Sequence, residues 1–244
     1  MNPVLYSAAG GANRILYAQH VSANNLSHSN TTGFKAIIER SMAVEREGAG
    51  FNTSASSVSN STAIDFTAGE LYRTGHPLDI GIDGEGFIAV QNPDGKEVYT
   101  RAGNIKSDAD GRLSINGRSL VNANGDEMIL PPYQNVNIGV DGSVTVIPID
   151  GVGSINIGQI KLVMPDKSEL AFSPNGYFES KNGEAFDPAA NVIVVAENLE
   201  QSNVSTMTEM IRLMQSTRQY EMQVKLMKAA DQLAANGAKL LRNS

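Results

Sequence analysis

The sequence predicts a mainly β protein with long terminal helices, in which the N- and C-terminal helices pair as a coiled coil and a central antiparallel β domain is looped out between them. Two observations support this prediction. Apolar residues recur at intervals of three and four near each end of the chain, which is typical of amphipathic helices. Between the two ends, short β-prone runs alternate with Asp-Gly and Asn-Gly pairs, which favour hairpin turns.

The first predicted helix starts at the amino end of the chain. Asn2 can cap a helix, and Pro3 is favoured in the first turn. One face carries small or apolar residues at Leu5, Ala9, Ala12, Leu16, Ala23 and Leu26, interrupted by Gln19. A stripe this narrow indicates a partner helix. Gly10 and Gly11 each cost about 1 kcal/mol relative to alanine inside a helix, so packing must supply this helix's stability.

A helix stop and a connector are predicted next. Gly33 follows a polar tail and can adopt a positive φ, and Phe34 then returns to a buried environment. Residues 48–64 contain no charged side chain and consist mostly of small polar residues, which favours an extended or flexible linker. The predicted division is an N-terminal helical segment at 1–35, a linker at 36–68, a β domain at 69–199 and a C-terminal helix at 200–244.

Turn signals dominate the central region. Its Asp-Gly and Asn-Gly pairs begin at Asp83, Asp94, Asp110, Asn116, Asn124, Asp141, Asp150, Asn175 and Asn182. Runs such as 87–90, 136–140 and 144–149 lie between these pairs and are rich in β-branched residues. The region is therefore predicted to form antiparallel strands joined by tight turns.

The C-terminal region predicts one long amphipathic helix from about Met207 to Leu241. Thr206 and Glu209 fit a capping box. The predicted seam is Met210, Leu213, Thr217, Tyr220, Val224, Met227, Asp231, Ala234, Ala238 and Leu241, and further apolar residues lie off it at Ile211, Met214, Leu226, Leu233 and Leu240. We expect neighbouring subunits to cover the second face. A self-contained helical hairpin docked on its own β domain is the alternative, and the residues leave both open.

Composition and motifs exclude several classes of function. The chain has no cysteine, so it has no disulfide, thiolate metal site or cysteine nucleophile. Its net charge of -7 and the lack of a basic cluster argue against nucleic-acid binding. His20, His28 and His76 lack metal-ligand spacing, and residues 107–111 read as a hairpin turn because the rest of a calcium loop is missing. We predict no catalytic residue, metal, cofactor or small-molecule substrate.

No targeting signal of a familiar kind is apparent. The first residues lack the basic segment and the apolar run of a cleavable secretory signal. No run approaches the roughly 20 apolar residues that a membrane helix needs. We therefore expect the chain to stay in the cytoplasm or to leave the cell by a route that reads another kind of signal.

Three blocks of sequence contain recognisable motifs. The blocks are SANNLS at 22–27 with TGFK at 32–35, then GELYRTGHPLD at 69–79 with GEGF at 84–87 and YTRAGN at 99–104, and finally EQSNV at 200–204 with EM at 209–210, RQYE at 218–221 and Lys225. The first block matches an ANNLA-type motif followed by T-x-G-F/Y-K/R, and the third matches S-N-V, E-M, R-x-Y-E and a lysine. In these motifs and in their order, which together cover most of the chain, the sequence resembles the flagellar basal-body rod and hook proteins.

The resemblance implies a non-enzymatic structural subunit of the rod. It implies that both terminal segments pack into a helical inner tube with proximal and distal rod proteins and with copies of this chain. It also implies export through the flagellar type III apparatus without signal cleavage, a position in the periplasm and a role in transmitting torque. The expected assembly interface is Leu5, Leu16, Asn24, Asn25, Leu26, Gly33, Phe34, Met210, Leu213, Tyr220, Val224 and Met227.

Two features favour a proximal over a distal rod protein within this family. The segment between Lys35 and Gly69 is short, and the wording Tyr-Glu-Met-Gln at 220–223 is closer to proximal rod proteins. A distal rod protein is the alternative within the family. Outside it, the alternatives are an adhesin or binding module on a coiled-coil stalk and, third, a calcium-dependent enzyme.

Overall fold

The chain folds into two compact units. The computed structural model describes residues 3–45, 55–149, 151, 153–173 and 176–242. The helical unit comprises Met1–Ser29, Ala36–Asp65 and Val204–Ser244, and the β unit comprises Asn30–Lys35 and Phe66–Asn203. Each unit is thus assembled from segments that are far apart in the sequence. No helix in the described part of the chain combines the length and the apolar character needed to cross a bilayer.

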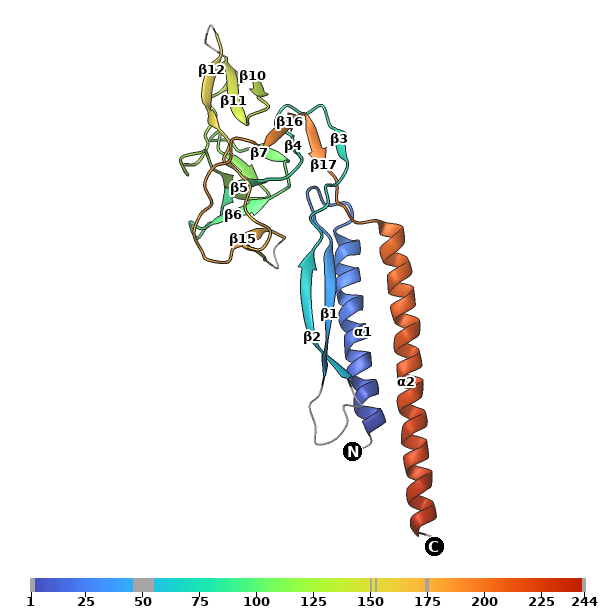
Figure 1. The fold of residues 1–244 in the computed structure, drawn as a ribbon. Coiled ribbons are helices and arrows are strands. Elements are labelled where there is room, and N and C mark those ends of the chain that lie inside the picture. The colour runs from blue at the N-terminus through green and yellow to red at the C-terminus, as the bar shows by residue number, and fades with distance from the viewer. Residues whose placement is uncertain (1–2, 46–54, 150, 152, 174–175, 243–244) are drawn as a thin grey trace. The chain divides into compact units, whose positions relative to one another are not determined.

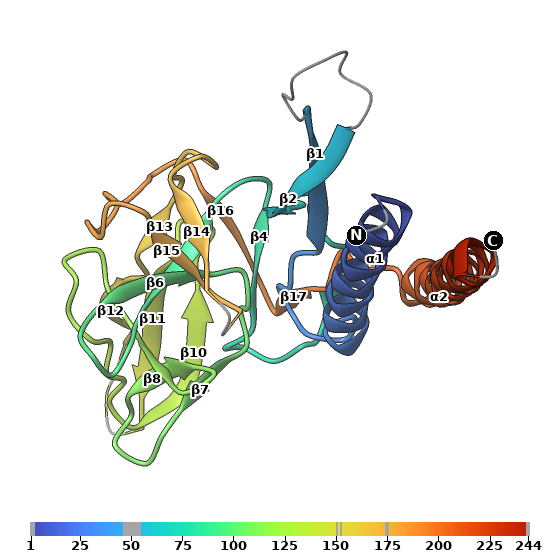
Figure 2. The same cartoon turned by 90° about the horizontal axis from the view of Figure 1, so that it is seen from below.

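Two helices and one β-hairpin form the helical unit (Figures 1 and 2). Helix α1 spans Pro3–Ser27 and helix α2 spans Thr206–Arg242. Strands β1 (Ile37–Glu45) and β2 (Ala55–Ile64) pair antiparallel. In both views α1 lies between the hairpin and α2, and it contacts both. Helix α1 is therefore the central element of this unit.

Two parts of the predicted extended or flexible linker, Ile37–Glu45 and Ala55–Ile64, are extended and pair as the strands β1 and β2. Each of these strands pairs one edge of its backbone with the other strand, and α1 supplies a packing surface without which an isolated two-stranded ribbon would be only marginally stable. Residues 48–64 contain few apolar side chains, and their composition could not show that a helix packs against this segment. Residues 46–54, which belong to the same predicted linker, lie outside the described residues.

The coiled-coil prediction is wrong. Helices α1 and α2 lie side by side (Figures 1 and 2). Polar and small residues interrupt the contact between them. Gln19 Nε2 donates a hydrogen bond to Thr217 Oγ1 at 3.2 Å, where a coiled coil would place interlocking apolar side chains. A cleft of about 260 Å³ lies here, lined by Gly11, Arg14, Ile15, Ala18, Glu39, Ser216, Gln219 and Gln223. Because α1 also packs on the hairpin, the unit is a helix pair with a ribbon.

Ser205 caps helix α2. Its Oγ accepts a hydrogen bond from the backbone N–H of Thr208 at 3.4 Å, and its carbonyl accepts the first helical bond, from Glu209 N at 3.0 Å. The Glu209 side chain accepts a bond from Arg212 Nη1 at 2.7 Å instead of turning back to the cap. The predicted capping box at Thr206 and Glu209 is therefore wrong by one residue. The other predicted cap, Asn2, lies outside the described residues.

The β unit confirms the predicted central antiparallel β domain. Its strands are β3 (Leu71–Arg73), β4 (Ile80–Asp83), β5 (Phe87–Gln91), β6 (Glu97–Thr100), β7 (Ile105–Ser107), β8 (Leu113–Ile115), β9 (Arg118–Leu120), β10 (Tyr133–Ile138), β11 (Ser143–Pro148), β12 (Ile155–Gln159), β13 (Leu162–Val163), β14 (Leu170–Phe172), β15 (Phe178–Ser180), β16 (Ile193–Ala196) and β17 (Asn198–Glu200). The largest sheet has the order β14-β15-β6-β5-β9-β8-β7, with β13 paired to β5. A second sheet has the order β10-β11-β12, and β16-β4 and β17-β3 form short ladders.

Turn chemistry sets the boundaries of many of these strands. Gly95, Gly117 and Gly142 follow Asp or Asn in tight turns and have φ values of 78°, 82° and 82°. Between β7 and β8, Asp108 Oδ1 accepts hydrogen bonds from the backbone N–H groups of Asp110 and Arg112. This arrangement confirms a hairpin turn at residues 107–111.

The β unit encloses a continuous apolar core. Ile80, Ile88, Val90, Leu120 and Val144 are completely buried and come from four different strands. Burying such side chains is the main favourable contribution to the folding of a domain of this kind. The β unit therefore has an interior of its own.

We predict that Leu120→Ala lowers the free energy of unfolding of the β unit by about 2–5 kcal/mol, because the truncated side chain leaves a cavity. Urea unfolding followed by circular dichroism measures this change. Ile155→Ala, at a side chain that is 49% exposed, is the control, and we expect a change below about 1 kcal/mol. Equal effects of the two substitutions would contradict this placement of the core.

Candidate assembly site and its buried ion cluster

A buried ion cluster lies at the point where the chain enters and leaves the β unit. Lys35 Nζ donates to Glu200 Oε1 at 2.6 Å, and Arg101 Nη1 donates to Glu200 Oε2 at 3.0 Å. The side chains of Lys35, Arg101 and Glu200 are only 1%, 4% and 1% exposed. A carboxylate thus balances two cations that water barely reaches.

Backbone groups add further hydrogen bonds to this cluster. The N–H of Gly69 also donates to Glu200 Oε1, at 2.8 Å, and Lys35 Nζ donates to the carbonyl of Thr67 at 2.8 Å. Arg101 Nη2 donates to the carbonyl of Gly84 at 2.7 Å. Hydrogen bonds to charged groups are stronger than those between neutral groups, and they offset part of the cost of removing the charges from water.

The cluster ties together segments that are remote in sequence. Lys35 ends the stretch 30–35, Thr67 and Gly69 precede β3, and Glu200 is the last residue of β17. Arg101, which directly follows β6, joins these segments to the largest sheet. The stretches by which the chain enters and leaves the β unit are therefore held in one place by a single carboxylate.

Gly33 fits tightly against this cluster. Its N–H donates to the carbonyl of Glu200 at 2.8 Å, and its φ is 69°, as the sequence predicted for a helix stop. A Cβ at this position would lie 2.2 Å from the carbonyl carbon of Arg101. Phe34, next in the chain, is 6% exposed, so its predicted burial is confirmed. Gly33 and Phe34 are therefore part of the packed interior of the β unit.

Asn25 fastens α1 to the hairpin inside the helical unit. Its Nδ2 donates to the carbonyl of Ile37 at 2.9 Å, and its Oδ1 accepts from the N–H of the same residue at 2.9 Å. The carboxamide therefore pairs with the edge of β1 as a neighbouring strand would. The Asn25 side chain is buried, whereas that of Asn24 is exposed. Of this pair, Asn25 has the internal structural role.

The predicted interface residues differ in how far their side chains are buried. Leu26, Leu213, Tyr220, Val224 and Met227 are half-buried. Leu16 is 36% exposed and Met210 is 50% exposed, so Met210 does not share the burial of the other seam residues on α2. The side chain of Leu5 lies outside the described residues. The chain itself therefore covers the side chains of the predicted seam only in part.

A second apolar face runs along α2. Its exposed residues are Met207 (73%), Met210 (50%), Ile211 (45%), Met214 (57%), Met222 (55%), Leu226 (56%) and Leu233 (73%). We call this set the outward face of α2. A monomeric soluble protein rarely exposes a large continuous apolar surface, so the outward face of α2 is the candidate surface for contact with another molecule.

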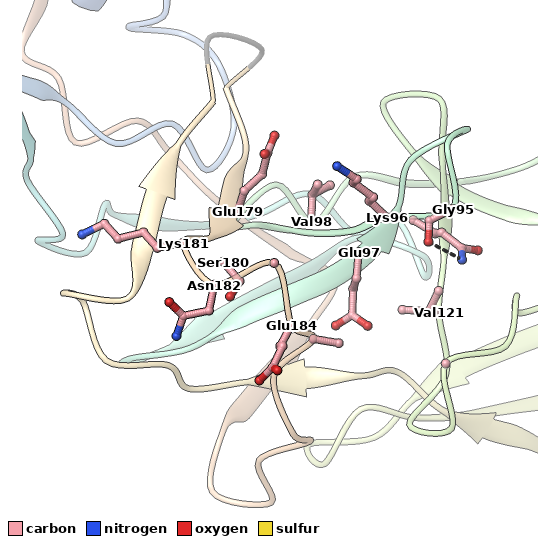
Figure 3. Close-up of a pocket in the computed structure, with 14 residues that line it drawn as sticks. Gly95, Lys96, Glu97, Val98, Val121, Glu179, Ser180, Lys181, Asn182 and Glu184 are labelled. Carbon is pink, nitrogen blue, oxygen red and sulfur yellow. Dashed lines mark hydrogen bonds between the residues drawn. The ribbon is translucent and has the colours of Figure 1, made fainter.

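One cleft of the β unit is lined by side chains of both charges. It has a volume of about 540 Å³ and lies beside β6 and the chain that follows β15 (Figure 3). Lys96, Lys181, Glu179 and Glu184 surround it, and Lys161 Nζ pairs with Glu97 Oε2 at 2.8 Å. Among the described residues, no group of three acidic or histidine side chains could hold a metal ion. The cleft offers no arrangement that we recognise as catalytic.

Burial raises the pKa of the Tyr99 phenol above its ordinary value. The Tyr99 oxygen accepts a hydrogen bond from the backbone N–H of Phe186 at 3.0 Å, and its ring packs against that of Phe186. The phenol therefore stays protonated over the neutral range. Its contacts are those of a buried structural tyrosine.

Comparison with known proteins identifies the class. Residues 195–240 match the family described as flagellar basal body rod FlgEFG protein C-terminal, and residues 81–157 match the flagellar hook protein FlgE/F/G D1 domain. The chain belongs to the flagellar basal-body rod and hook protein family, and it is a structural subunit of the flagellar rod.

Within that family the chain is FlgF-like. It is 31% identical to the flagellar basal-body rod protein FlgF of Escherichia coli (strain K12) and 29% identical to FlgF of Salmonella typhimurium, in both cases over 100% of each chain. It is also 30% identical to the flagellar basal-body rod protein FlgG of Buchnera aphidicola subsp. Schizaphis graminum, over 96% of this chain and 97% of that one.

Sequence reasoning did not identify the ion cluster. Lys35, Arg101 and Glu200 all lie in the blocks that resemble the family, but those blocks gave no indication that the three charges meet. The available signal was that each of these three residues is the only charged residue of its motif, in TGFK, YTRAGN and EQSNV. Charges in such surroundings are usually paired when the motif is buried.

We predict that Glu200→Gln lowers the free energy of unfolding of the β unit by about 3–5 kcal/mol, because it leaves Lys35 and Arg101 buried without a counter-charge. Glu197→Gln is the matched control. Glu197 also pairs with an arginine, Arg73, but the two side chains are 39% and 77% exposed, so we expect a loss below about 1 kcal/mol. Urea unfolding measures both, and equal losses would contradict the proposed role of the cluster.

We predict that Gly33→Ala destabilises the β unit far more than Gly95→Ala. Both residues have a positive φ, so each alanine costs about 1–2 kcal/mol of backbone strain. A Cβ at Gly95 meets no atom within 4 Å, whereas a Cβ at Gly33 collides with the backbone of Arg101. Thermal unfolding of the two variants isolates the steric contribution. Similar melting temperatures would show that the chain at Gly33 is not packed as described.

Proposed function

We propose that this chain is a subunit of the proximal rod, which transmits torque from the motor toward the distal rod and the hook. It would assemble with proximal and distal rod proteins and with copies of itself, and it would carry no enzymatic activity. The observation that carries the proposal is the outward face of α2, whose apolar side chains are exposed in the single chain. Similarity to FlgF along the whole chain supports the proximal assignment.

The proposed interface combines two surfaces of the helical unit. The half-buried seam residues Leu213, Tyr220, Val224 and Met227 lie on one side of α2, and the exposed outward face lies on another. A single partner helix cannot cover both surfaces. Neighbouring subunits in a helical array would bury the remainder, as in heterologous interfaces that repeat along a filament.

We further propose that the rod lies in the periplasm and that the chain reaches it unfolded through the flagellar type III export apparatus, without signal cleavage. The lack of cysteine supports this route, because no disulfide would resist unfolding. The glycine pair at residues 10–11 also supports it, because these residues weaken α1 until it packs on its neighbours.

A distal rod protein is the second candidate, and the similarity to FlgG of Buchnera favours it. An adhesin on a helical stalk is the candidate from another class. Analytical ultracentrifugation separates the adhesin from the rod proteins, because an adhesin stalk would form a small stable oligomer. A rod subunit outside its assembly is expected to be monomeric with protease-sensitive ends.

We predict that Met214→Asp prevents incorporation of the chain into basal bodies, because it places an unpaired carboxylate in an apolar interface at a cost on the order of 3 kcal/mol or more. Ile193→Asp is the matched control. Its side chain has a similar exposure, 54% against 57%, but it lies in β16 of the β unit. Swimming of a strain that lacks its own copy of the gene, together with immunoblots of purified basal bodies, measures the effect.

Full swimming with Met214→Asp, in a variant whose circular dichroism matches the original chain, would remove the outward face from the interface. Loss of swimming with both variants would show that exposed apolar residues of the two units contribute alike. Either result would refute an interface centred on α2.

A further inference from the structure

The outward face of α2 is unusually rich in methionine. Five of the chain's nine methionines lie in this helix. Among the methionines whose side chains are described, Met207, Met210, Met214 and Met222 are between 50% and 73% exposed. Outside this helix, Met164 is 37% exposed and Met128, in the core of the β unit, is 3% exposed. The exposed thioethers are therefore concentrated on one helix.

Their spacing places them along one side of the helix. Met207, Met210 and Met214 are three and four residues apart, so they lie above one another on consecutive turns. Met222 follows two turns further on, close to Leu226 on the same outward face. Met227, which is half-buried, belongs to the opposite seam. The four exposed methionines form a stripe, which we call the methionine stripe.

Methionine is the chain's most readily oxidised side chain. The sequence contains no cysteine and no tryptophan. A flexible thioether also adapts to irregular apolar neighbours better than a branched side chain, which suits a surface that contacts subunits of different sequence. Conversion to the sulfoxide makes the same side chain polar and disrupts interfaces rich in methionine.

We propose that the methionine stripe is an oxidation site that controls whether a free subunit can enter the rod. The oxidant is a peroxide. A sulfur lone pair attacks one peroxide oxygen, an S–O bond forms and the O–O bond breaks. With hydrogen peroxide, sulfur is oxidised by two electrons to the sulfoxide, and the other oxygen leaves as water after taking up the proton of the transferred oxygen.

This inference rests on the proposed function, because it assumes that the outward face is buried on assembly. Before assembly the four sulfurs are open to solvent and can be oxidised. Once neighbouring subunits cover them, access of peroxide is lost. Oxidation therefore acts on the free subunit, and reduction of the sulfoxides by methionine sulfoxide reductases restores its capacity to assemble.

The chemical step is tested on the purified full-length chain treated with hydrogen peroxide, with sulfoxide measured at each position by peptide mass spectrometry. We expect Met207, Met210, Met214 and Met222 to react roughly tenfold or more faster than Met128, because susceptibility follows exposure. Oxidation of Met128 at the same rate as the stripe, in a chain that stays folded, would overturn the inference.

The functional step is tested with two quadruple variants in a strain that lacks its own copy of the gene. Met→Leu at 207, 210, 214 and 222 keeps the stripe apolar and removes its sulfurs. Met→Gln at the same four positions imitates the polarity of the sulfoxide. We expect the Leu variant to enter basal bodies and support swimming like the original chain, and the Gln variant to fail with unchanged helicity and melting temperature.

A competition experiment tests oxidation directly. The original chain and the Leu variant are produced in the same cells, and peroxide is present while new basal bodies form. We expect the ratio of original to Leu chain in basal bodies to fall below their ratio in the free pool. An unchanged ratio would overturn the inference, as would a Gln variant that swims or a Leu variant that fails. A folded original chain that never appears in basal bodies would instead refute the proposed function.

Discussion

The carboxylate of Glu200 is the constraint on which the arrangement of the β unit depends. It accepts hydrogen bonds from Lys35, Arg101 and the backbone of Gly69, and so it joins three separate parts of the chain. A buried ion pair is weak evidence for net stability, but a buried cation without its partner is very costly. The cluster therefore selects one arrangement of the connecting segments, since any other would leave a charge unpaired in the interior.

The tight packing around the cluster explains why glycine occupies positions 33 and 69. A Cβ on Gly69 would lie 1.9 Å from the carbonyl oxygen of Gln201, and one on Gly33 would meet the backbone of Arg101. The backbone thus approaches itself more closely than any larger residue allows. A subunit that carries torque benefits from connecting segments whose positions are fixed by charge and by contact. This links the cluster to the proposed function.

The two units satisfy their apolar residues in different ways. The β unit buries its own core, with Ile88, Leu120 and Val144 completely enclosed. The helical unit leaves Met207, Leu226 and other large side chains of α2 exposed. Exposed apolar surface of this kind is favourable only when another molecule covers it. The helical unit is therefore the part of the chain that we expect to be completed by assembly.

Local pattern predicted much of this structure. Periodicity indicated both helices, and the Asp-Gly and Asn-Gly pairs indicated the turns of the β unit. Pattern alone could not show that α1 packs on a ribbon as well as on α2, because the strands of that ribbon contain few apolar residues. Nor could it pair Lys35 with Glu200, which are 165 positions apart. The sequence predicted Thr206 as the cap in place of Ser205 because serine and threonine are both favoured at this position and the two residues are neighbours.

The predictions of site residues also succeeded where local pattern was sufficient and failed where tertiary contacts decide. The helical repeat was enough to group Leu213, Val224 and Met227, which are half-buried, on one side of the helix. The repeat could not predict that Met210 is exposed, because the seam and the outward face of α2 each contain apolar residues at intervals of three and four. The internal roles of Asn25 and Gly33 depend on Ile37 and Arg101, which only the tertiary structure brings to them.

The most direct test of the central claim is quantitative peptide mass spectrometry of hook–basal bodies purified from the source cell by detergent extraction and density centrifugation. The account predicts that this chain is present at a low ratio to hook protein, and that the ratio stays constant through repeated washes. A ratio several times higher would move the assignment to the distal rod. Absence of the chain from these particles, in cells that produce both the chain and complete flagella, would contradict the account.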